Sequence, residues 1–82
     1  MDQPARTQKQ LGNELRRQRK KRSLTQAELS RLIDKRQATI SHLESEGSGS
    51  LDTFFAVLSA LDIEIVLRPR SKSERAKIAD IF

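Results

Sequence analysis

The hexapeptide LTQAEL constrains the fold more than any other part of this 82-residue chain. Its Thr25 and Glu28 have the spacing of a capping box, in which each side chain accepts a hydrogen bond from the other residue's backbone N–H. Leu24 and Leu29 stand where a hydrophobic staple packs across the start of a helix. The pattern therefore predicts a helix that begins at Gln26.

Three further helices are predicted around this one. Thr7 can cap a helix that ends near residue 22, and Ser50 can cap another over residues 51–61. Asp34 and its neighbour break the pattern before a helix over residues 36–45. Apolar side chains recur every three or four residues, so each helix has one face for a common core. The predicted core faces comprise Leu11, Leu15, Leu29, Leu32, Ile33, Ile40, Leu43, Leu51, Phe54, Phe55, Leu58 and Leu61.

The periodicity changes after the fourth helix. Ile63, Ile65 and Leu67 alternate along one side of a β-branched segment that Pro69 ends, which predicts one β-strand over residues 62–69. No second strand is predicted, and a lone strand leaves its backbone groups unpaired. We expect the same strand of a second copy to pair with it, antiparallel across a two-fold axis. An extended arm lying on its own domain is the alternative.

The charge of the chain is concentrated near its start. Sixteen Lys and Arg against 11 Asp and Glu give a net charge of +5, and six of the basic residues fall within residues 16–22. Such a block indicates a polyanionic partner. The alternative is a solvated helix end, where Lys and Arg are favoured by the negative C-terminal end of the helix dipole.

Composition excludes several other classes of protein. The chain has no cysteine and one histidine, so we expect neither a metal site nor a cofactor. An enzyme is not expected, because Ser41 and His42 are adjacent in a predicted helix and diverge by about 100°. No apolar run approaches the length of a membrane span and no signal peptide is present, which predicts a cytoplasmic protein without membrane contact.

Two short helices with a tight turn and a basic segment beside them describe a helix-turn-helix, whose second helix enters the major groove of DNA. The exposed face of that helix is predicted to be small and polar. Arg suits guanine edges, Gln suits adenine, and Ala allows apolar contact with a thymine methyl group. The residues expected to contact bases are Arg36, Gln37, Ala38 and Ser41. Phosphate contacts are expected from Thr25, Gln26, Thr39, Arg17 and Lys21.

The stretch LTQAELSRLIDKRQATISHLES resembles the Cro/repressor-type (XRE-like) helix-turn-helix family. The resemblance as a whole covers roughly residues 10–61. The resemblance implies a compact, mainly α-helical DNA-binding domain of four to five helices. It also implies that Gln26 contacts phosphate, that Ile40 anchors the recognition helix, and that Glu44 is structural. The glycine usual in the turn of this family is replaced by Asp34, which tolerates the left-handed conformation better than most residues.

A longer similarity reaches the end of the chain. The motif RQATISHLE, a serine cap before Phe-Phe and a single terminal strand are similar to HipB-type antitoxins. This resemblance implies a bacterial, nucleoid-associated homodimer that represses its own operon by binding double-stranded operator DNA, and that binds a HipA-like serine/threonine kinase toxin. The alternatives are a stand-alone phage-type or housekeeping repressor with no toxin, and a protein-interaction module whose basic segment binds an acidic protein.

The expected organisation has four parts. A disordered tail over residues 1–6 precedes a helix-turn-helix domain over residues 7–61, followed by a dimerisation strand over residues 62–69. A flexible tail over residues 70–82 ends the chain, with a degradation signal or a partner-binding helix as the alternatives there. The side chains expected at the dimer interface are Ile63, Ile65 and Leu67.

Overall fold

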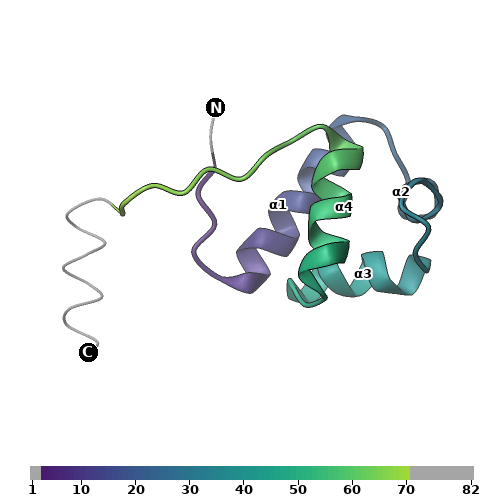
Figure 1. Cartoon of the computed structure of the whole chain (residues 1–82), viewed down its shortest axis with the longest axis horizontal. Coiled ribbons are helices and arrows are strands. Elements are labelled where there is room, and N and C mark those ends of the chain that lie inside the picture. Colours follow the sequence, from purple (N-terminus) through teal and green to yellow (C-terminus); the bar gives the residue numbers. More distant parts are fainter. Residues whose placement is uncertain (1–2, 71–82) are drawn as a thin grey trace.

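The computed structural model describes residues 3–70, which form four α-helices and a terminal segment without helix or strand (Figure 1). The helices are α1 (Gln8–Lys21), α2 (Gln26–Leu32), α3 (Gln37–Glu46) and α4 (Leu51–Leu61). The prediction of a mainly helical domain is confirmed, with four helices in this part of the chain. Of the predicted flexible tail, residues 71–82 lie outside the described residues.

The predicted starts of α1, α2 and α4 are confirmed by their capping bonds. The Thr25 hydroxyl accepts from the backbone N–H of Glu28 at 3.0 Å, and the Glu28 carboxylate accepts from the backbone N–H of Thr25 at 2.9 Å. These two bonds form the capping box of α2. The pKa of the Glu28 carboxyl is lowered, because the backbone N–H and the side chain of Thr25 favour its charged form. Thr7 and Ser50 cap α1 and α4 with a single side-chain bond each, accepting from the backbone N–H of Gln10 and of Thr53.

The four helices share one core, and three of the predicted core residues are not in it. The buried apolar side chains are Leu15, Leu29, Ile40, Leu43, Phe54, Val57, Leu58 and Leu61. By contrast, Leu32, Leu51 and Phe55 are 63%, 72% and 53% exposed. Their predicted burial is wrong because the apolar stripe of each helix is wider than the face that packs against the core. Phe55, for example, lies about 100° around α4 from the buried Phe54.

Glycine allows α1 to approach the backbone of α3. A Cβ atom at Gly12 would lie only 2.6 Å from the carbonyl oxygens of Leu43 and Glu44. At the other end of the contact, Gly47 ends α3 with φ of 68°, and a Cβ there would overlap the backbone of Gln8. The C-terminal half of α3 is thus fixed directly against α1, with its buried face turned inward.

The turn between α2 and α3 keeps its geometry without glycine. Asp34 adopts the left-handed conformation with φ of 55°, as predicted from its tolerance of this region. The backbone N–H of Lys35 donates to the carbonyl of Ser30 at 2.9 Å and closes the C-terminal end of α2. Arg36 is the N-cap of α3, so the helix begins one residue later than predicted.

The predicted strand over residues 62–69 is not observed within the described part of the chain. Asp62 ends α4 in the left-handed conformation with φ of 56°, and the backbone N–H of Ile63 donates to the carbonyl of Leu58 at 3.0 Å. Residues 64–70 make no backbone–backbone hydrogen bond to any described residue. A strand is defined by its ladder with a neighbour, and residues 3–70 offer none. Pairing between two copies therefore stays a prediction.

Gly12→Ala should lower the free energy of unfolding by roughly 1–3 kcal/mol, because its methyl group overlaps two carbonyl oxygens of α3 and forces the helices apart. Urea unfolding followed by circular dichroism measures this change. The control is Asn13→Ala at the exposed neighbouring position of α1, which should be neutral or slightly stabilising. An equal gain in stability from both variants would contradict the close contact.

Candidate DNA-binding surface

The side chains predicted to contact bases lie together on the outer face of α3. Gln37, Ala38 and Ser41 are exposed and span about 100° of the helix, while Ile40 and Leu43 on the other side are buried. This face has small polar side chains and no bulky group to hold the helix away from a groove. The structure therefore brings together the set that the sequence predicted.

Arg36 extends this surface at the N-terminal end of α3. Its side chain is exposed and caps no helix, although its carbonyl accepts from the backbone N–H of Thr39 at 3.0 Å. Thr39 is half-buried, and lines a shallow cavity together with Arg36, Lys35 and Asp34. The two long donors, Arg36 and Gln37, thus stand at the start of the recognition helix.

A buried network links α3 to the predicted phosphate contact at Gln26. The Glu44 carboxylate accepts from Arg19 Nε at 2.7 Å, from Arg19 Nη2 at 3.0 Å, and from Gln26 Nε2 at 3.1 Å. Arg19 Nη1 donates to the carbonyl of Leu24 at 2.7 Å. The side chains of Arg19 and Glu44 are only 8% and 3% exposed, so the structural role implied for Glu44 is observed. Three helices are joined by these bonds.

Sequence reasoning missed the role of Arg19. It was counted with the basic residues of 16–22, yet the structure buries it against Glu44 and removes it from the surface. One signal could have found it: Arg19 follows Leu11 and Leu15 at four-residue intervals, on the buried face of α1. A cation at that position of an apolar stripe needs a buried anion.

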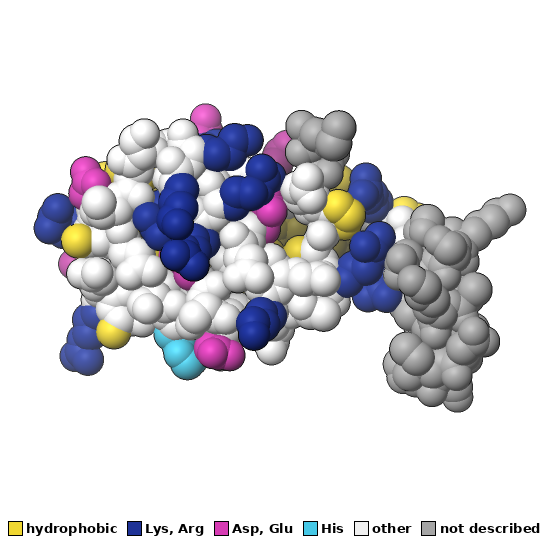
Figure 2. Space-filling model, turned by 180° about the vertical axis from the view of Figure 1, so that it is seen from behind, with side chains coloured by type: hydrophobic (Ala, Val, Ile, Leu, Met, Phe, Trp, Pro, Cys, Tyr) yellow, Lys and Arg dark blue, Asp and Glu magenta, His cyan; other side chains and the backbone are white. Residues whose placement is uncertain are grey.

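The other predicted phosphate contacts are at the surface, on α1 and at the start of α2. Arg17 is exposed and donates from Nη2 to the Glu14 carboxylate at 2.6 Å, and this hydrogen bond lowers the pKa of Glu14. Lys21 and Thr25 are exposed as well. Figure 2 shows Lys and Arg side chains gathered on the face seen from behind, opposite α4. Arg17 and Lys21 are thus available to a polyanion, but do not belong to the outer face of α3.

Comparisons with known proteins agree with this geometry. The helix-turn-helix family model HTH_3 matches residues 15–67. The chain therefore belongs to the XRE-type helix-turn-helix family of DNA-binding regulators, which are typically not enzymes. No curated protein sequence matches it.

Solved structures similar to this chain include complexes of HipB. A HipB–O4 20mer complex and a HipA–HipB–O2–O3 complex contain chains that are each 32% identical, with TM-scores of 0.78 and 0.77. A structure described as MDT Protein is also 32% identical, with a TM-score of 0.77. Each match covers 85% of this chain and 100% of the other chain.

Residues 3–70 also bear on metal binding and membrane insertion. They contain no cluster of three or more His, Cys, Asp or Glu side chains that could hold a metal ion. In the same range, no helix has both the length and the apolar character to cross a bilayer.

Gln37→Ala should weaken binding to the protein's own promoter DNA by roughly 1–3 kcal/mol and relax the preference at one base pair, because a base-edge contact is lost. Titrations on promoter and random duplexes measure both effects. Gln8→Ala, at an exposed glutamine of α1, is the control and should change neither. Equal losses on the two duplexes would show that Gln37 contacts the DNA backbone instead.

Proposed function

We propose that the chain is a homodimeric repressor that binds operator DNA and is the antitoxin of a HipA-like kinase toxin. The observation that carries the DNA-binding mode is the exposed, small polar face of α3, whose opposite face is fixed by α1. Function of this kind is binding alone, with no bond made or broken in DNA. Repression follows when the bound protein excludes RNA polymerase from the operator.

The proposed contacts divide into two groups. Arg36 and Gln37 have the length to reach base edges, whereas Ala38 and Ser41 allow the helix to approach closely. Backbone contacts orient the domain on the duplex without selecting sequence, and we assign them to Thr25, Gln26, Thr39, Arg17 and Lys21. In a symmetric dimer, the two copies of α3 would enter successive major grooves about 34 Å apart on a palindromic site.

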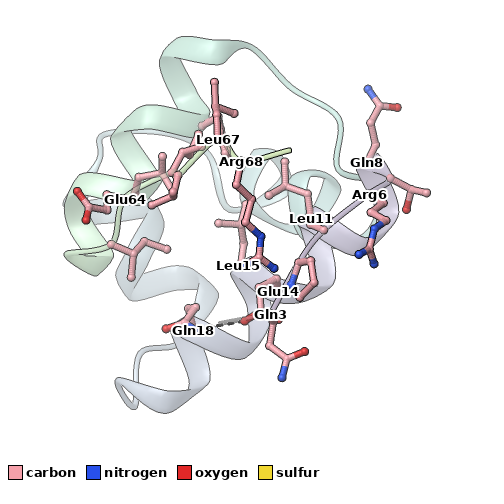
Figure 3. A pocket seen from close by; sticks show the side chains of 18 residues that line it. Gln3, Arg6, Gln8, Leu11, Glu14, Leu15, Gln18, Glu64, Leu67 and Arg68 are labelled. Carbon is pink, nitrogen blue, oxygen red and sulfur yellow. Dashed lines mark hydrogen bonds between the residues drawn. The ribbon is translucent and has the colours of Figure 1, made fainter. Parts of the chain in front are cut away.

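The terminal segment supports a dimer. Ile63 packs against the core of its own chain, so only part of the predicted dimerisation set is free for a partner. Ile65 and Leu67 are 43% and 93% exposed, in a stretch whose backbone groups form no ladder with any described residue. The segment borders a cavity of about 720 Å³ that Leu11 and Leu15 of α1 also line (Figure 3). Exposed apolar side chains beside unpaired backbone are the features that strand pairing between subunits would cover.

The toxin partner is supported by the structural similarity. A chain 32% identical to this one stands in a HipA–HipB–O2–O3 complex, and the likeness covers that whole chain. A stand-alone repressor would have the same fold and the same DNA surface. The two functions differ in whether a kinase binds the protein, so kinase binding is the property that distinguishes them.

The double variant Ile65→Lys with Leu67→Lys should be a monomer, because two charges replace apolar side chains at the proposed subunit contact. Light scattering after size exclusion measures the mass, and circular dichroism should show unchanged helices. Leu51→Lys is the control, since Leu51 is 72% exposed outside this segment, and it should leave the dimer intact. A dimeric double variant would refute strand pairing.

Co-expression with the product of the neighbouring gene should yield a complex that contains a kinase of HipA type and that shifts the promoter fragment in a gel. Sizing of the complex gives its stoichiometry. A promoter shift without any kinase partner would identify a stand-alone repressor. A co-purifying partner without a DNA shift would identify a protein-interaction module instead.

A further inference from the structure

The Glu44 carboxylate holds the side chain of Gln26 in one orientation. Glu44 lies on α3 and Gln26 is the first residue of α2, and the 3.1 Å bond from Gln26 Nε2 crosses between the two helices. An ionised carboxylate can only accept hydrogen bonds, so the amide nitrogen, and not the amide oxygen, must face it. One N–H of that amide is thereby used, and the other N–H is held in a defined direction.

Arg19 makes this arrangement compatible with a nearby phosphate. An unpaired carboxylate behind Gln26 would repel the DNA backbone and would be costly to bury. The two-point contact from Arg19 Nε and Nη2 neutralises Glu44 and occupies both of its oxygens. Arg19 is itself held by the carbonyl of Leu24, next to the capping box of α2. The orientation of Gln26 therefore depends on two side chains that are too buried to touch DNA.

We propose that Glu44, held by Arg19, is a positioning residue that directs the free N–H of Gln26 toward a phosphate oxygen of the operator. The inference rests on the DNA contacts of the proposed function. It adds a connection between two of those contacts: α3, which contacts bases, also orients the phosphate contact made by Gln26 on α2. A half-buried Gln26 with a free amide would lose side-chain entropy on binding, whereas the held amide has lost it already.

A double-mutant cycle on the dimer tests this coupling. Gln26→Ala should weaken operator binding about tenfold in the wild-type background, as expected for a hydrogen bond to a charged group. The second background is the paired replacement of Arg19→Met with Glu44→Leu, because apolar side chains of similar volume commonly preserve a fold that held a buried ion pair. In that background the affinity for the operator should already be about tenfold lower than in the wild type. Adding Gln26→Ala should then lower the affinity by less than a further twofold.

Lys21→Ala is the matched control, since Lys21 is an exposed residue that we assign to a phosphate and that has no part in the network. Its effect should be the same in both backgrounds. If Gln26→Ala costs about tenfold in both, the positioning role is wrong and the phosphate contact stands. If Gln26→Ala has no effect in the wild type, the contact itself is wrong, while Gln37→Ala still tests DNA binding. If Lys21→Ala also loses its effect, the replacement acts through general structural damage and the positioning role is refuted.

A second measurement needs no variant and so does not depend on the replaced pair folding. Side-chain amide relaxation in the free protein should show the Gln26 NH₂ group ordered, in contrast to the exposed Gln37 NH₂ group on the outer face of α3. Equal mobility of the two amides would overturn the proposal.

Discussion

The contact between α1 and α3 is the constraint on which the rest of the structure depends. Gly12 brings the backbones together, and the Arg19–Glu44 pair joins the same two helices through a buried ion pair. Because the inner side of α3 is used in this way, its other side is left for DNA. The short helix α2 is tied to both through Leu24 and Gln26. The recognition helix thus has a fixed direction before any ligand arrives, which is the condition for contacts that select sequence.

Local features of the chain were predictable from the sequence, and features that depend on distant partners were less so. The caps at Thr7, Thr25 and Ser50 involve residues three apart, so a short window contains all the information. The outer face of α3 followed from helical spacing alone. Arg19 was harder, because its partner is 25 residues away and its basic neighbours are at the surface. Leu51 was assigned to the core, since nothing in its own helix marks the edge of the packed face.

The terminal segment illustrates a different limit. Its alternating apolar residues carry a strand pattern, but whether that pattern becomes a ladder depends on a second strand. In the described part of the chain the segment is anchored at one end, where Ile63 packs on the core and bonds to Leu58. Its continuation leaves Val66 and Leu67 73% and 93% exposed. A sequence pattern here specifies a propensity, and residues 3–70 contain no neighbouring strand that fulfils it.

The burial of Arg19 also changes how the protein should respond to ionic strength. Of the six cations in residues 16–22, Arg19 is buried in its ion pair with Glu44, which leaves five at the surface. Each phosphate neutralised by a protein cation releases condensed counterions and adds about 0.9 to the slope of log affinity against log salt concentration. The basic segment should therefore contribute a slope of at most five cations and not six, and DNA binding should tolerate salt better than composition suggests.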